Sequence, residues 1–107
     1  MRYELHNGAV HVPAALERVI GTKVGKIEKR LKHYHPDVAD LEIRLAHMDK
    51  VNEYECKIVL RAFKETLHAK KAAPELRVAV DKSFEAMMRE LESYRVRLNP
   101  SLQDHTP

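Results

Sequence analysis

The chain has 107 residues, 44% of them hydrophobic and 33% charged, and its 19 Lys and Arg against 16 Asp and Glu give a net charge of +3. This length supports the core of one domain and is too short for two. No apolar run approaches the roughly 20 residues of a membrane span, which excludes a transmembrane helix. The single cysteine, Cys56, excludes an internal disulfide and favours a reducing, cytoplasmic location.

The first third of the chain predicts a strand and then a long helix. Residues 1–6 alternate, which places Tyr3 and Leu5 on one buried face, and Asn7-Gly8 breaks the strand. A helix is expected over residues 13–33, because Pro13 suits a first helical turn and His35-Pro36 ends the periodic pattern. Its apolar residues share one stripe: Leu16, Ile20, Val24, Ile27 and Leu31.

Three strands and a second helix are expected in the rest of the chain. Residues 40–45 and 53–62 alternate in polarity and are joined by a turn-like segment, so they should pair antiparallel. A shorter strand is expected over residues 65–71, and Pro74 opens a helix that ends near residue 99. The apolar stripe of this helix consists of Leu76, Val80, Phe84, Met87, Leu91, Tyr94 and Leu98.

The order β-α-β-β-β-α predicts an α+β fold with a four-stranded sheet and both helices packed on one face. The first strand should run parallel to the second, because a helix joins them. We expect a single domain over residues 1–99 and a short polar tail over residues 100–107. The open sheet face, which carries charged residues such as Glu42, Arg44 and Lys57, should meet water.

The first helix separates its basic residues from its acidic ones. At about 100° per residue, Lys23, Lys26, Lys29 and Arg30 fall on one flank of the apolar stripe, and the acidic residues fall on the other flank. Residues 18–33 hold six Lys and Arg against one Glu. Such a line of cations matches the phosphates of a nucleic-acid strand, although a solvated lysine-rich helix face is an equally good reading of the pattern alone.

Four further cations are candidates for the same surface. Lys70 and Lys71 end the last strand, and Lys82 and Arg89 share a face of the second helix, whose first turn also holds the cation Arg77. Acidic residues surround the second pair, and Glu85 is spaced to form an ion pair with Arg89. Ordinary pairing on the helix surface therefore explains Lys82 and Arg89 when they are taken alone.

Three segments of the sequence resemble the short ribosome hibernation-promoting factors, also called ribosome-associated inhibitors or sigma-54 modulation proteins. They are ALERVIGTKVGKIEKRL (residues 15–31), LHA (residues 67–69) and VAVDKSFEAMMREL (residues 78–91). The resemblance implies the β-α-β-β-β-α fold, similar to the double-stranded-RNA-binding domain. The long members of that family carry an additional C-terminal domain, and we expect this protein to correspond to the short form.

The resemblance also implies a function. A hibernation factor binds rRNA on the small ribosomal subunit, between head and body, and blocks the mRNA and tRNA sites under stress or in stationary phase. By position, Lys23, Lys26, Lys29 and Arg89 match basic sites of the family. Ala86, Glu92 and Ser93 stand where the family is usually basic, which weakens the expected share of the second helix.

No motif indicates enzymatic chemistry, a cofactor or a small-molecule substrate. The seven histidines do not have the spacing of a metal site, and Cys56 falls on an inward strand position, where a buried thiol is expected.

Two other functions remain open at this point. The open sheet face could recruit a protein such as a transcription factor, or the chain could bind double-stranded RNA on its own. We expect a monomer when the protein is free, and the sequence does not decide whether it promotes or prevents ribosome dimers.

Overall fold

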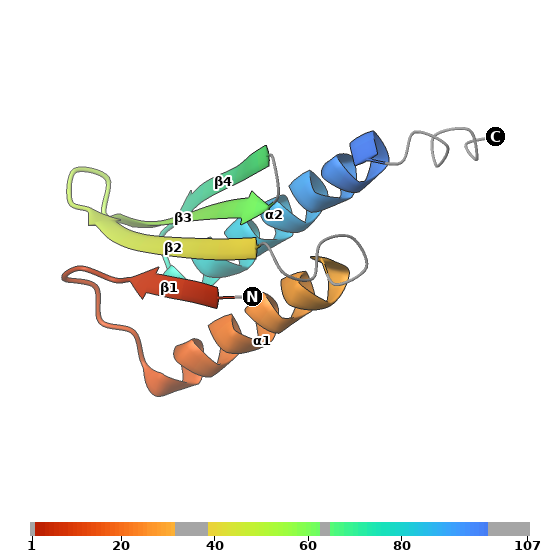
Figure 1. Cartoon of the computed structure of the whole chain (residues 1–107). Helices are drawn as coiled ribbons and strands as arrows, with labels where there is room; N and C mark the ends of the chain where they lie inside the picture. Colours follow the sequence, from red (N-terminus) through yellow and green to blue (C-terminus); the bar gives the residue numbers. More distant parts are fainter. Residues whose placement is uncertain (1, 32–38, 63–64, 99–107) are drawn as a thin grey trace.

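The computed structural model describes residues 2–31, 39–62 and 65–98, which form four strands and two helices. In chain order they are β1 (Arg2–His6), α1 (Ala14–Leu31), β2 (Ala39–Met48), β3 (Glu53–Ala62), β4 (Glu65–Ala73) and α2 (Leu76–Leu98) (Figure 1). The predicted α+β class and element order are confirmed. The predicted end of the first helix at His35-Pro36 and the tail lie outside the described residues.

The four strands form one mixed sheet in the order β1-β2-β3-β4. β1 pairs parallel with β2 from Arg2↔Asp40 to His6↔Arg44, as a connecting helix requires. β2 and β3 pair antiparallel, as do β3 and β4. Asn52, in the turn between β2 and β3, has a φ of +51°, a conformation that Asn tolerates better than most residues.

Both helices pack against the same face of this sheet, and the core lies between the two layers (Figure 1). The predicted stripe of α1 is wholly buried, and Ile27 has no exposed surface. Helix α2 packs on β3 and β4. Its buried Ser83 donates a hydrogen bond to the backbone carbonyl of Cys56 at 2.6 Å, which joins the helix to the middle of the sheet.

The two helices run side by side in the same direction (Figure 1). The order of their contacts shows this direction, because Lys23 of α1 pairs with Asp81 of α2, and Arg30, further along α1, pairs with Glu92, further along α2. One flank of α1 therefore faces one flank of α2 along much of their length.

Three expectations about the strands need correction. Tyr3 is 42% exposed and Leu5 only half-buried, because β1 is an edge strand that no other strand covers on its outer side. β4 continues two residues beyond the predicted Lys71 and buries Ala73. β2 runs to Met48, three residues beyond its predicted end at Leu45, because its pairing with β3 continues to Met48↔Glu53.

Candidate nucleic-acid interface

The basic flank of α1 lies beside α2, and this neighbour decides which of its cations are free. The helix begins where the carbonyl of Pro13 accepts hydrogen bonds from the N–H groups of Leu16 (2.9 Å) and Glu17 (3.0 Å). From that start the 3.6-residue period turns the apolar stripe onto the sheet and the predicted basic flank toward α2.

An N-terminal ion-pair cluster, made of Lys23, Asp81 and Arg77, connects the two helices. Lys23 Nζ lies 3.1 Å from Asp81 Oδ1, and Arg77 Nε lies 3.3 Å from Asp81 Oδ2. Lys23 Nζ also lies 6.0 Å from the centre of the Phe84 ring, and its side chain is only 23% exposed. Burial alone would raise the pKa of Asp81, but the bonds from Lys23 and then Arg77 outweigh burial and hold that pKa below its usual value.

A C-terminal ion-pair cluster repeats this arrangement further along the helices. Arg30 Nη1 lies 3.4 Å from Glu92 Oε2, and Arg95 Nη1 lies 3.0 Å from Glu92 Oε1. Each cluster places two cations on one carboxylate, so each keeps a net positive charge. Glu92 stands at a position where the resemblance implied a base, and the structure shows that it pairs with Arg30 and Arg95 instead.

Lys26 and Lys29 are the members of the predicted basic flank that no carboxylate of α2 holds. Both side chains are exposed, and neither forms an ion pair with any residue in the part of the chain that the structure describes. A hollow of about 380 Å³ lies beside Lys26 and is also lined by Arg18, Lys23 and Arg77. The outer side of α1 therefore offers two lysines without an ion pair among the described residues, and one of them, Lys26, borders a cationic groove.

The other four predicted cations do not gather in one place. Strand alternation places Lys70 on the open sheet face, 4.0 Å from Glu55, and Lys71 on the helix-side face at the sheet edge. Lys82 and Arg89 are exposed on the outer side of α2, and neither has an ion-pair partner among the described residues. The expected Glu85–Arg89 pair is therefore not formed.

Arg18 and Arg77 are two groove residues that sequence reasoning did not include in the site. The sequence places Arg77 in the first turn of the second helix and Arg18 in the basic segment 18–33, but neither is among the eight predicted contact residues. The parallel arrangement of the helices brings them to the same hollow. A helical wheel of either helix alone cannot show this, because it gives an angle but not a neighbour.

The open sheet face carries opposite charges that pair with one another. Glu42 of β2 is contacted by Arg44, by Arg61 Nη2 at 3.2 Å and by His6 Nε2 at 3.6 Å. The hydrogen bond from Arg61, with the further bond from Arg44, lowers the pKa of Glu42 against the effect of burial. This face has few unpaired cations to offer a polyanion.

Cys56 is buried, and burial raises the pKa of its thiol to about 11, which makes it a poor nucleophile. Among residues 2–31, 39–62 and 65–98, no three His, Cys, Asp or Glu side chains come together as metal ligands.

Neither α1 nor α2 has the length and apolar character needed to cross a bilayer.

The fold and the helix layer define a small α+β protein with one mixed sheet, two parallel helices and exposed cations on its helix side. The chain belongs to the family described as sigma 54 modulation protein / S30EA ribosomal protein, whose model matches residues 3–99. This is a family of ribosome-associated factors and not of enzymes. No curated protein matches the chain.

The solved structures that match this chain include two with the same fold. One is a ribosomal subunit interface protein from Coxiella burnetii, with a TM-score of 0.72 and 15% identity over 90% of this chain and 99% of that one. The other is the N-terminal domain of Protein Y from Thermus thermophilus, with a TM-score of 0.67 and 12% identity over 84% of this chain and 93% of that one. They confirm the β-α-β-β-β-α arrangement.

Proposed function

We propose that this protein is a ribosome hibernation factor, which binds rRNA of the small ribosomal subunit and blocks the mRNA and tRNA sites under stress or in stationary phase. Membership of a ribosome-associated family supports the partner, and one protein of similar fold, from Coxiella burnetii, is described as a ribosomal subunit interface protein. The single observation that carries the proposal is the pair of exposed, unpaired lysines, Lys26 and Lys29, on the outer side of α1. A cytoplasmic location is part of this proposal, because translation takes place there.

Inhibition in this proposal is steric and needs no chemical step. While the domain occupies the subunit, mRNA and tRNA cannot enter. Lys26 and Lys29 would neutralise rRNA phosphates and release their counterions, which makes binding sensitive to salt and weakly dependent on base sequence. Each added phosphate contact steepens the dependence of log affinity on log salt by roughly 0.7 to 0.9.

The predicted contact residues have different parts in this proposal. Lys26 and Lys29 make the central contacts, with Lys71, Lys82 and Arg89 as exposed cations further out. Lys23 and Arg30 add positive charge while they connect α1 to α2. Lys70 is left out of the contact surface, because it lies on the other face of the sheet beside Glu55.

The test compares Lys26→Glu and Lys29→Glu, singly and together, in co-sedimentation with ribosomes. Each substitution reverses a charge at an exposed site that no ion pair holds, so the fold should be unchanged by circular dichroism. We expect each single variant to weaken ribosome binding by about tenfold, which is about 1.4 kcal/mol, and the double variant to abolish co-sedimentation.

Lys57→Glu is the matched control. Lys57 is also exposed and without an ion pair among the described residues, but it lies on the open sheet face. If Lys57→Glu weakens binding as much as Lys29→Glu does, net charge and not the α1 surface determines affinity. Unchanged co-sedimentation of the double variant would contradict the proposed surface.

Two other functions are distinguished by separate measurements. A protein-interaction module acting through the open sheet face would retain its partner after nuclease treatment and lose it when Glu55, Lys57 and Arg61 are changed. A free-standing duplex binder would bind naked double-stranded RNA as tightly as ribosomes. The paired charges of the open face leave the protein-interaction module less well supported, and membership of a ribosome-associated family favours the ribosome over a naked RNA duplex.

A further inference from the structure

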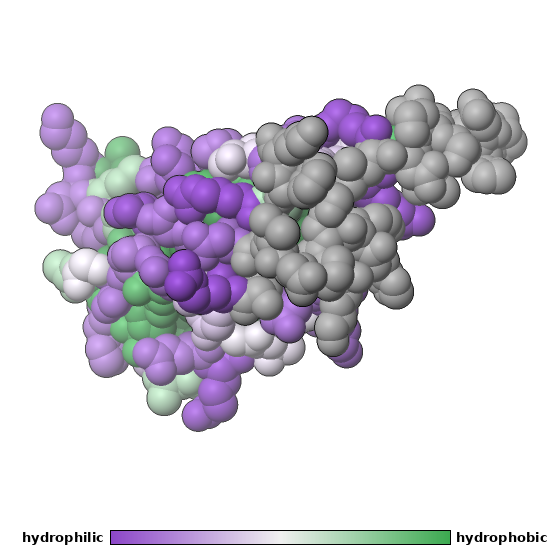
Figure 2. All heavy atoms as spheres, in the orientation of Figure 1, coloured by the Kyte–Doolittle hydropathy of each residue, from purple (hydrophilic) through white to green (hydrophobic). Residues whose placement is uncertain are grey.

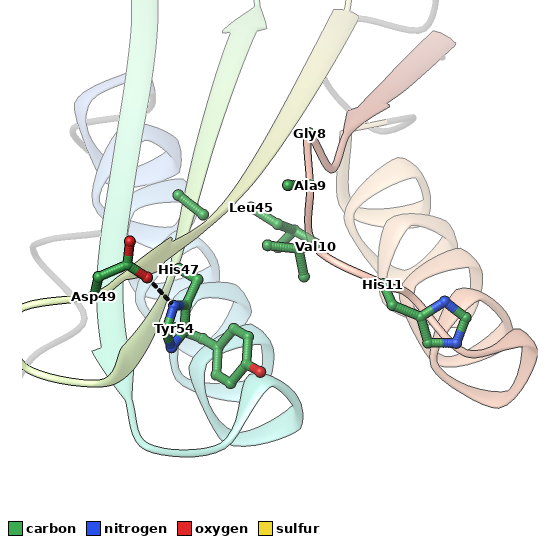
Figure 3. Close-up of a pocket in the computed structure, with 9 residues that line it drawn as sticks. Gly8, Ala9, Val10, His11, Leu45, His47, Asp49 and Tyr54 are labelled. Carbon is green, nitrogen blue, oxygen red and sulfur yellow. Dashed lines mark hydrogen bonds and ion pairs between the residues drawn. The ribbon is translucent and has the colours of Figure 1, made fainter.

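A hollow of about 800 Å³ lies at the end of the sheet, where β1 has ended and β2 continues (Figure 3). We call it the hairpin hollow. Val10 and Leu45 form its apolar floor, at 7% and 5% exposure. His47 and Tyr54 lie on one side of it and His11 on the other (Figure 3). The space-filling view shows apolar surface on this same side of the molecule, among polar side chains (Figure 2). None of its lining residues belongs to the cationic surface on the helices.

One edge of β2 is free beside this hollow. β1 pairs with β2 only as far as His6↔Arg44, whereas β2 continues to Met48 in its pairing with β3. In the part of the chain that the structure describes, no loop backbone hydrogen bond reaches residues 45–48. The backbone groups on that side of the four residues therefore have no strand partner, and an unpaired edge of this kind is a template for an added strand.

Both walls of the hollow are fixed by their own hydrogen bonds. In the loop after β1, Asn7 Nδ2 donates to the carbonyl of Val10 at 2.8 Å, and the N–H of Val10 donates to the carbonyl of Asn7, also at 2.8 Å. On the other wall, His47 Nδ1 lies 2.8 Å from Asp49 Oδ1, and His47 Nε2 lies 3.0 Å from Asn52 Oδ1. A site held in this way loses little conformational freedom when it is filled.

We propose that the hairpin hollow is a docking site for an extended segment of another protein, which adds as a strand to the free edge of β2. The free backbone of residues 45–48 supplies main-chain hydrogen bonds, and the apolar floor receives one aliphatic side chain of the segment. Alternation then turns the next side chain away from the floor. The carboxylate of Asp49, which is 95% exposed, favours a Lys or Arg at one end of the segment.

A nucleotide fits these observations less well. The lining holds no Lys or Arg for a phosphate, and both ring nitrogens of His47 already face oxygens. A base would also leave the free backbone edge unpaired. The proposal goes beyond the proposed function, because it concerns a different surface and a protein partner.

The experiment titrates the full chain with the peptide acetyl-Lys-Thr-Val-Thr-Val-Thr-amide and follows backbone amide resonances. We expect saturable shifts at residues 8–11 and 45–48 and slower amide exchange on β2. The same peptide with alternate backbone nitrogens methylated should not bind, because strand addition needs those N–H groups. The proposal would be overturned if the methylated peptide still binds, or if the unmethylated peptide causes no saturable shift at these residues. It would also be overturned if AMP shifts the resonances of these residues and the peptide does not.

Two tryptophan variants provide the matched comparison. Ala9→Trp fills the hollow from an exposed position on its wall, and Val51→Trp adds the same side chain at a 59% exposed position outside the lining. We expect Ala9→Trp to raise the dissociation constant of the peptide at least about tenfold and Val51→Trp to change it less than about twofold. Equal effects of the two variants would refute the site. Retained ribosome binding by Ala9→Trp would show that any failure concerns this site and not the proposed function.

Discussion

At the scale of single residues, the cations of the helix layer fall into two kinds. Lys26 and Lys29 are exposed and without an ion-pair partner among the described residues, whereas Lys23 and Arg30 are held by carboxylates of α2. A phosphate that recruits a lysine from an ion pair must compete with the carboxylate already there. The same residue type on one helix flank therefore contributes differently to binding a polyanion.

Asp81→Asn tests this distinction. Removing the carboxylate charge frees Lys23 and Arg77 and takes one negative charge from the edge of the groove. We expect ribosome affinity to rise and its salt dependence to steepen by about one phosphate contact. Because the pair is partly exposed, the free energy of unfolding should fall by only about 1 kcal/mol or less, measured by urea denaturation.

Glu90→Gln is the control for this variant, because Glu85 lines a hollow together with Lys23 and Lys26 and Glu90 is not in that lining. It removes the same charge from an exposed position of α2, where no ion pair with a described residue is lost. A smaller gain in affinity for this variant is expected. Weaker ribosome binding by Asp81→Asn would mean that Asp81 orients Lys23 for contact and does not restrain it.

At this scale, the burial of the apolar side chains of α1 could be predicted from the sequence, but the ion pairs between α1 and α2 could not. All five apolar residues of the α1 stripe are buried, because helical periodicity fixes their direction. Periodicity gives no information about the neighbouring helix, so the pairing of Lys23 with Asp81 could not be predicted. Tyr3 was placed on a buried face by alternation alone, but the lack of an outer neighbour for β1 leaves it exposed.

At the scale of elements, one histidine at the end of β2 makes hydrogen bonds to two residues of the turn that joins β2 to β3. His47 places one ring nitrogen against Asp49 and the other against Asn52, and its ring lies 4.8 Å from that of Tyr54. The Asp49 carboxylate and then the Asn52 side chain raise the pKa of His47 above its usual value. The protonated ring donates to both oxygens, so the turn is best held when His47 carries its charge.

His47→Gln should reveal a stability contribution that depends on pH. Because the pKa of His47 is raised in the folded state, its contribution is fully present below about pH 6.5, the unfolded value. It is lost as the pH rises through the higher folded value. The difference in the free energy of unfolding between wild type and variant should therefore shrink from pH 6 to pH 9, measured by urea denaturation. A difference that grows with pH would contradict this role.

The boundaries of elements were predicted less well than their existence. β4 runs two residues past its predicted end, because pairing with β3 continues to Tyr54↔Ala73 regardless of the polar Lys70-Lys71 pair. Ser83 was not expected in the core. It is fully buried because its hydroxyl satisfies the carbonyl of Cys56, a partner that is distant in the sequence.

At the scale of the whole molecule, Glu42 joins three strands across the open face. It contacts His6 of β1, Arg44 of its own strand and Arg61 of β3. A carboxylate held by several cations stabilises the sheet only while it is ionised. The stability of the whole fold should therefore fall when acid protonates Glu42.

Glu42→Gln should change the response of the protein to acid. Because the pKa of Glu42 is lowered on folding, its contribution is present above about pH 4.3, the unfolded value, and is lost as the pH falls through the folded value. Wild type should lose more stability than the variant between pH 5 and pH 3 in thermal unfolding. Glu90→Gln, at an exposed position without an ion pair among the described residues, should behave like wild type.

Most of the fold could be predicted from the sequence, but only part of the candidate site. The order of elements and the parallel β1–β2 pairing follow from alternation, periodicity and crossover rules that act locally. The groove beside Arg18 and Arg77 depends on how α1 packs against α2. The free edge of β2 depends on where its pairing with β1 ends. Such features are set by tertiary packing.

The reactivity of the Cys56 thiol can report how often the helix layer separates from the sheet. It is the only thiol in the chain, it is buried at the centre of β3, and its pKa of about 11 leaves almost no thiolate near neutral pH. An alkylating reagent should therefore reach it only when the helices separate from the sheet. The alkylation rate, followed by mass spectrometry with and without ribosomes, would report how far the bound state suppresses that separation.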